Sequence, residues 1–189
     1  RAVKNIFNTV KIPGISLSSA NSINIGRLIP QVVYYIYTYI CLVNKGKIKY
    51  GEKINFSVPT GNFGNILACY IAKMLGTPIN HVICASNKNN VLTDFFKTGE
   101  YNANRPFYVT NSPSMDILVS SNLERLLYLM TNDKNYVKEL MQSLNQNGSY
   151  KVNKDLFSEL QNIDATYVDE EETKKAIKEL YYNKGILID

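Results

Sequence analysis

Apolar side chains recur at helical spacing over residues 25 to 40 and predict a long helix there. The aliphatic members of this pattern are Ile25, Leu28, Ile29, Val32, Val33, Ile36 and Ile40. Because tyrosines lie between them, the segment is apolar nearly all round, which is typical of a helix packed on both sides. Asn21 or Ser22 is expected to cap its start.

In the next segment apolar and polar residues first alternate, then apolar residues recur at helical spacing, and then the alternation returns. This pattern predicts a β-turn-α-β unit. Residues 53 to 58 form a strand that Pro59 ends, residues 60 to 64 a turn, residues 65 to 75 a helix, and residues 81 to 85 a second strand. A unit of this kind has parallel strands and a right-handed crossover. The sequence therefore predicts an α/β fold.

Shorter elements follow this unit. The expected helices cover residues 90 to 98, 122 to 129, 132 to 146, 153 to 162 and 169 to 183, and the expected strands residues 107 to 110 and 186 to 188. Asp169 with Glu172 three residues later predicts a capping box at the start of the last helix.

The composition excludes several classes of function. The net charge is +5, but the 21 basic residues are scattered among 16 acidic ones. The motifs of nucleic-acid-binding domains are absent, so we expect no nucleic-acid partner. No apolar run reaches the roughly 20 residues of a membrane span, so we expect no membrane partner.

Cysteine and histidine usage predicts no metal site and a reduced compartment. The three cysteines form no C-x-x-C pair and lie in apolar segments, as small buried hydrophobic residues do. Such usage favours a cytoplasmic location. The single histidine, His81, has no Cys or His partner at ligand spacing.

The turn between the first strand and the helix has the chemistry of a phosphate site. The first N–H groups of a helix lack intrahelical acceptors, and the helix dipole favours an anion there. Gly61 and Gly64 allow close approach of the backbone, and either can take positive φ, while Asn62 and Asn65 offer amide donors. Neither a P-loop nor a dinucleotide-binding pattern is present. On this pattern alone, a phosphate site and an ordinary structural turn remain equal alternatives.

Residues 57 to 68 resemble the cofactor-phosphate motif of threonine synthases of the fungal and enterobacterial type. Other segments match this family in the same order. They are Asn21 to Asn24 with Arg27, Gln31 to Tyr35, Asn87 to Tyr101, Ser112 to Ile117, and Ser120 to Leu127. The resemblance is strong over residues 15 to 130.

The resemblance implies the tryptophan synthase β-like architecture of pyridoxal-phosphate (PLP) fold type II, with a three-layer parallel sheet flanked by helices. It implies part of an enzyme that converts O-phospho-L-homoserine and water to L-threonine and phosphate with PLP. Residues 1 to 189 would be the large PLP-phosphate-binding domain, with residues 132 to 184 as a helical extension. The cofactor phosphate would be held by Gly61, Asn62, Phe63, Gly64 and Asn65.

The resemblance also implies that the reactive lysine lies elsewhere. In the family it precedes the turn in a Phe-Lys-Asp context, which no lysine of this sequence has. Lys97 follows Phe96, but beyond the motif. We therefore expect a fragment that lacks the N-terminal region with this lysine and also the C-terminal end of the enzyme. Such a fragment has no catalytic residue of its own, is inactive alone, and acts with the remaining segments of the enzyme. Asn65 stands where many members have Asp, and Ile25 and Gly26 replace a common Trp-Ala pair.

Four polar residues before and within the long helix are candidates for binding the substrate. They are Asn21, Ser22, Asn24 and Arg27. The first three serve equally well as helix caps, and Arg27 pairs either with a substrate anion or with a surface acid. Similarly, Ser112, Ser114 and Asp116 either shape the floor of the site or form a simple turn.

Two other functions remain open at this point. A threonine-synthase-like phospho-lyase would eliminate phosphate from the same substrate. A non-catalytic phosphate-binding module would use the same turn without chemistry. The sequence leaves the oligomeric state open.

Overall fold

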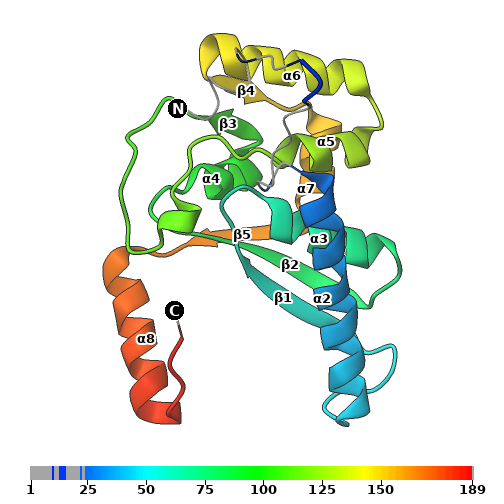
Figure 1. Cartoon of the computed structure of the whole chain (residues 1–189), viewed down its shortest axis with the longest axis vertical. Helices are drawn as coiled ribbons and strands as arrows, with labels where there is room; N and C mark the ends of the chain where they lie inside the picture. The colour runs from blue at the N-terminus through cyan, green and yellow to red at the C-terminus, as the bar shows by residue number, and fades with distance from the viewer. Residues whose placement is uncertain (1–9, 11–12, 16–21, 23, 189) are drawn as a thin grey trace.

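Three parallel strands form the centre of the fold, in the order β1-β2-β5 (Figure 1). They are β1 (Ile54–Pro59), β2 (Ile79–Ser86) and β5 (Ile163–Tyr167). The computed structural model describes Val10, residues 13 to 15, Ser22 and residues 24 to 188. The buried apolar side chains of the sheet are those of Val58, Ile79, Val82, Cys84 and Ile163.

Helices flank this sheet. Their bounds are α2 (Ile25–Asn44), α3 (Gly64–Met74), α4 (Val91–Thr98), α5 (Leu123–Thr131), α6 (Lys134–Asn147), α7 (Lys154–Leu160) and α8 (Glu170–Lys184), with a short 3-10 turn, η1 (Pro113–Met115). A separate antiparallel ribbon pairs β3 (Glu100–Asn102) with β4 (Ser149–Lys151). Helix α3 is deeply buried, and its Ile66, Leu67, Ala68 and Cys69 belong to the core.

The predicted β-turn-α-β unit is confirmed. β1 pairs with β2 in parallel, with Val58 opposite Cys84 and Pro59 opposite Ala85. The turn and the start of α3 therefore lie at the carboxyl edge of the sheet, where ligands of open α/β folds bind. The expected parallel sheet flanked by helices is observed.

Two predicted strands are wrong. Residues 107 to 110 and 186 to 188 are irregular. In the first segment the backbone N–H groups of Tyr108 and Thr110 donate to the side chains of Asn89 and Asp116, so they are not available to a strand partner. A β-prone run becomes a strand only beside another strand.

The third strand of the sheet and the ribbon escaped prediction. β5 lies within residues 132 to 184, which the sequence presents as a helical extension, yet it pairs in parallel with β2 from Val82 to Ser86. β3 and β4 are three residues long each. Their pairing depends on contacts between segments far apart in the sequence.

The long helix is packed on one side, not on both. Leu28, Val32, Tyr35 and Tyr39 are buried against the core. The opposite side is apolar and exposed, and it comprises Ile25, Ile29, Val33, Tyr34, Tyr37 and Ile40. The cap is Asn24, whose side chain accepts the N–H of Gly26 at 2.8 Å. The expectation for Ser22 as cap is therefore wrong, and Asn21 lies outside the described residues.

The capping box of the last helix is confirmed. Asp169 accepts the N–H of Glu172 at 2.9 Å, and the Glu172 carboxylate accepts the N–H of Asp169 at 3.2 Å. Helix α8 carries no buried residue and lies away from the helices around the sheet in Figure 1. Its start is capped by its own side chains, and the Glu170 carboxylate accepts the N–H of Asn111 at 3.0 Å.

The cysteines and the histidine have structural roles. Cys69 and Cys84 are buried free thiols, and burial raises the pKa of each to about 12. The Nδ1 atom of His81 lies 2.7 Å from the Oδ2 atom of Asp164 on the neighbouring strand. Among the described residues, no cluster of His, Cys, Asp and Glu side chains is arranged to hold a metal ion. Over the same residues, no helix is long and apolar enough to cross a membrane.

Candidate functional site

The turn before α3 bends at a residue that the sequence does not single out. Phe63 has a φ of 64°, in the left-handed region, whereas neither Gly61 nor Gly64 has a positive φ. A non-glycine residue in this region costs on the order of 1 kcal/mol. The Phe63 ring is 1% exposed and stacks on Phe96 with centroids 5.9 Å apart, and this burial offsets the cost. Either glycine could take a positive φ, but in this turn the residue that does so is Phe63.

The carbonyl groups of the turn are bound by the segment that leads into α5. The Ser120 hydroxyl donates to the Gly61 carbonyl at 2.9 Å. Asn122 donates to the Asn62 carbonyl twice, from its backbone N–H at 3.1 Å and from its side-chain Nδ2 at 2.8 Å. Asn122 is fully buried, so these bonds hold the turn against a rigid part of the protein.

Asn122 also joins the start of α2 to the turn. Its Nδ2 donates to the Ser22 carbonyl at 3.1 Å, and its Oδ1 accepts from Arg125 at 2.7 Å. One buried amide therefore connects three segments far apart in the sequence. Sequence analysis missed this residue, although its motif matched the family, because a buried hydrogen-bonding hub has no local pattern.

With its carbonyl groups bound, the turn keeps unpaired N–H groups beside a cavity. Within the described part of the chain, the backbone N–H groups of residues 61 to 65 have no hydrogen-bond acceptor. Phe63 supplies no side-chain cap for α3. The cavity beside them has a volume of about 190 Å³ and is lined by all five of these residues. Unpaired N–H groups at a helix start attract an anion.

The two glycines of the turn have different constraints. A Cβ added at Gly61 would lie 2.8 Å from the Ser114 carbonyl oxygen and 3.1 Å from the Met115 Cα, so the protein itself requires a glycine there. At Gly64 the nearest atom to such a Cβ would be the Asn122 Nδ2 at 3.6 Å, an ordinary contact. Gly64 therefore has no packing reason to be a glycine.

Tyr35 on α2 holds the side chain of Asn65. Its hydroxyl donates to the Asn65 Oδ1 and lies 3.2 Å from the Asn65 carbonyl oxygen. The Tyr35 ring packs edge-to-face on Phe56 of β1, with centroids 4.9 Å apart. Burial, with a smaller contribution from Cys69, raises the pKa of the Tyr35 hydroxyl well above its usual range. The hydroxyl therefore remains a hydrogen-bond donor at neutral pH.

Of the residues proposed from the sequence to bind the substrate, only some line the cavity at the turn. Ser22 and Arg27 line the cavity, as does Gln31 one turn further along α2. Asn24 is the helix cap and does not line it. A cation and an amide on α2 thus face the same space as the N–H groups of the turn.

The loop at 112 to 116 contributes one residue to the cavity and one anchor. Ser114 lines the cavity. Asp116 binds the end of β2 and accepts hydrogen bonds from Asn87, Asn89 and Thr110. Burial alone would raise the pKa of the Asp116 carboxyl, but these hydrogen bonds outweigh it and hold that pKa below its usual range. Asp116 is therefore a structural anion that fixes the loop over Gly61.

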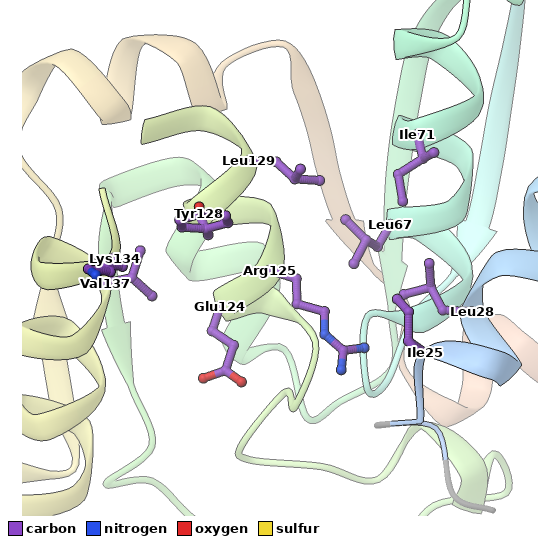
Figure 2. Close-up of a pocket in the computed structure, with 10 residues that line it drawn as sticks. All are labelled: Ile25, Leu28, Leu67, Ile71, Glu124, Arg125, Tyr128, Leu129, Lys134 and Val137. Carbon is purple, nitrogen blue, oxygen red and sulfur yellow. The ribbon is translucent and has the colours of Figure 1, made fainter. Parts of the chain in front are cut away.

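A second cavity, of about 400 Å³, lies between α2, α3, α5 and α6. Figure 2 shows Leu28, Leu67 and Ile71 on one side of it and Tyr128 and Leu129 on the other. Its walls are mainly apolar, and it lacks the converging donors of the turn. The larger space is thus an apolar groove, and the smaller one is the site with anion-binding chemistry.

The cavity at the turn has no lysine among the described residues that line it. Lys97 is exposed on α4 and lies outside this set. The arrangement can bind an anion and orient what is attached to it.

Comparisons with known proteins agree with this geometry. Threonine synthase-like 1 of Homo sapiens is 47% identical over an alignment that covers 100% of this chain and 27% of the relative. Threonine synthase of Saccharomyces cerevisiae is 38% identical over 88% of this chain and 34% of its own length. The PLP-bound threonine synthase of Brucella melitensis superposes with a TM-score of 0.91 at 38% identity, over 99% of this chain and 40% of that structure. The chain is homologous to a segment of the threonine synthases.

The expected architecture of PLP fold type II is thereby confirmed. No family model matches the chain. The chain spans 27% to 40% of the length of these relatives. What the relatives do as whole enzymes therefore bears on this chain only as a basis for a proposal.

Proposed function

We propose that the chain is the large PLP-phosphate-binding domain of a threonine synthase-type enzyme, and that the turn at residues 60 to 65 holds the cofactor phosphate. The observation that carries the proposal is the set of unpaired N–H groups of residues 61 to 65 on one cavity. The residues fit the group, since a phosphate monoester needs several converging donors and close approach of the backbone. The Brucella relative is PLP-bound.

In this function the backbone of Gly61, Asn62, Phe63, Gly64 and Asn65 binds the phosphate and fixes the cofactor's position. PLP, when bound, supplies an electron sink that stabilises a carbanion on the amino-acid substrate. Arg27 lines the same cavity and orients a second anionic group, which in O-phospho-L-homoserine is a carboxylate or the phosphate ester. Ser22 contributes a further polar contact, and Asn24 acts through the helix start that it caps.

In our proposal, the catalytic lysine is not one of the residues of this chain that line the cavity. The chain binds the cofactor through its phosphate, and the remaining segments of the enzyme supply the reactive amine. The proposed reaction is the conversion of O-phospho-L-homoserine and water to L-threonine and phosphate. The chain alone would then be inactive.

A phospho-lyase remains the second candidate, because the cavity at the turn would hold the cofactor phosphate in the same way for a synthase and for a lyase. An enzyme that carries this chain with its remaining segments would form threonine from O-phospho-L-homoserine in the first case and 2-oxobutyrate in the second. Measuring both products in one assay distinguishes the two reactions.

Binding of the phosphate can be tested without chemistry. The probe is 4′-deoxypyridoxine 5′-phosphate, which has the ring and the phosphate but no aldehyde to react with surface lysines. We expect calorimetry to show binding of this probe and a loss of about tenfold or more for 4′-deoxypyridoxine, which lacks the phosphate. Equal affinity for both would contradict the proposal. Inorganic phosphate binding as tightly as the probe would favour a non-catalytic module.

A further inference from the structure

Among the residues that the structure describes, only one of the two ends of the Asn65 side-chain amide has a hydrogen-bond partner. Its Oδ1 accepts the Tyr35 hydroxyl, and Asn65 is an exposed residue that lines the cavity at the turn. An amide is planar, with an acceptor oxygen on one side and an NH₂ group with two donors on the other. When the oxygen is held by Tyr35, the NH₂ group is directed away from α2.

The hydroxyl that fixes this orientation is itself fixed. Tyr35 is 6% exposed, and its ring is held against Phe56. Because its pKa is raised by burial and by Cys69, the hydroxyl keeps its proton. The backbone carbonyl of Asn65 lies 3.2 Å from the same hydroxyl and is part of the first turn of α3. In the structure this hydroxyl donates to the Asn65 Oδ1, and that bond sets the orientation in which the NH₂ group faces away from Tyr35.

We infer that Tyr35 is a positioning residue for the phosphate site, which orients the Asn65 amide so that its NH₂ group donates to the bound phosphate monoester. This inference rests on the proposed function and adds a side-chain donor to its backbone N–H groups. An N–H donor to a charged oxygen is stronger than one to a neutral acceptor. Asn65 also carries no charge, whereas a carboxylate at this position would place a negative charge beside the phosphate.

The test compares two tyrosines on one helix. Tyr35→Phe removes the hydroxyl that holds Asn65. Tyr39→Phe, the matched control, removes a hydroxyl that is also buried on α2 but accepts the N–H of Gly51 at 2.7 Å, away from the turn. Asn65→Ala and the double variant Tyr35→Phe/Asn65→Ala complete a cycle, with 4′-deoxypyridoxine 5′-phosphate as the probe.

We expect affinity to fall about fivefold in Tyr35→Phe and about tenfold in Asn65→Ala, and the double variant to bind no more weakly than Asn65→Ala. Tyr39→Phe should bind as the wild type does. Wild-type affinity in Tyr35→Phe, or losses that multiply in the double variant, would overturn the inference.

A measurement on the wild-type protein guards against misfolding of a variant. The side-chain ¹H–¹⁵N signals of Asn65 should shift when the probe is added, together with the backbone amides of residues 61 to 65. Backbone shifts without any shift of the Asn65 side chain would overturn the role of Tyr35 and leave the proposed function standing. If the backbone amides do not shift either, the proposed function and this inference both fall.

Discussion

Two helix starts in this protein have opposite chemistry. Helix α8 begins with Asp169 and Glu172, whose side chains close a capping box, and with three glutamates in its first turn. Helix α3 begins after Phe63 without a side-chain cap and without an acidic residue in its first turn. The first start satisfies the N–H groups of Asp169 and Glu172 with its own side chains, and its glutamates repel anions. The second start has neither a side-chain cap nor an acidic residue, and it leaves its N–H groups for a ligand.

The difference shows what makes a helix start a binding site. Every helix has orphan N–H groups and a dipole. At α3 the rest of the protein binds the carbonyl groups of the turn through Ser120 and Asn122 and leaves the N–H groups exposed to a cavity. At α8 the sequence itself closes the end. The chemistry of each helix start therefore depends on whether the protein provides hydrogen-bond partners for its carbonyl groups or for its N–H groups.

The largest effect on the α3 start is expected from Asn122→Leu, which removes the buried amide that binds the turn. The substitution leaves the Asn62 and Ser22 carbonyl groups without their Nδ2 donor in a fully buried position. We expect the free energy of unfolding to fall by about 3 kcal/mol. Urea denaturation measures this change. The exposed Asn162→Leu, whose side chain bonds only to the nearby Glu159 carbonyl, is the control and should cost far less. A loss no greater than in this control would contradict the role of the hub.

Gly61→Ala should have the next largest effect. Its Cβ would lie 2.8 Å from the Ser114 carbonyl oxygen, so the loop over the turn must move. We expect a loss of about 2 kcal/mol in unfolding free energy, within the range for overpacking, together with weaker binding of the phosphate probe. An unchanged urea midpoint would show that the loop is not held against this glycine.

Gly64→Ala separates binding from folding. A Cβ at this position would lie 3.6 Å from the Asn122 Nδ2 and 4.0 Å from the Ser22 carbonyl oxygen, so the fold accepts it. Because Gly64 lines the cavity, we expect the added methyl group to narrow the space where the phosphate approaches. We expect stability within about 0.5 kcal/mol of the wild type and affinity for the probe reduced about tenfold. Unchanged affinity would mean that the anion does not approach Gly64.

Asp169→Ala tests the other helix start and should have the smallest effect. Loss of an N-cap costs about 1 kcal/mol, and because α8 has no buried residue the effect stays within that helix. Amide hydrogen exchange should accelerate at residues 170 to 173, with the affinity for the phosphate probe unchanged. A loss of phosphate affinity would contradict the independence of the two helix starts.

The sequence predicts what depends on neighbouring residues and misses what depends on distant ones. The unit from Ile54 to Ser86 and the Asp169 capping box follow local patterns and are observed. β5 escaped because its five residues are a strand only beside β2. At the site, Gly61 and Asn65 stand out in the sequence, whereas the left-handed Phe63, the Asn122 hub and the Tyr35 hydroxyl are consequences of tertiary packing.

The most direct test of the account compares the two helix starts in one spectrum. The protein is labelled with ¹⁵N and titrated with 4′-deoxypyridoxine 5′-phosphate while the backbone amides are followed by NMR. We predict saturable shifts at residues 61 to 65 and none at residues 170 to 172. Shifts at both helix starts, or at neither, would contradict the claim that, of these two starts, the fold leaves that of α3 open to a phosphate.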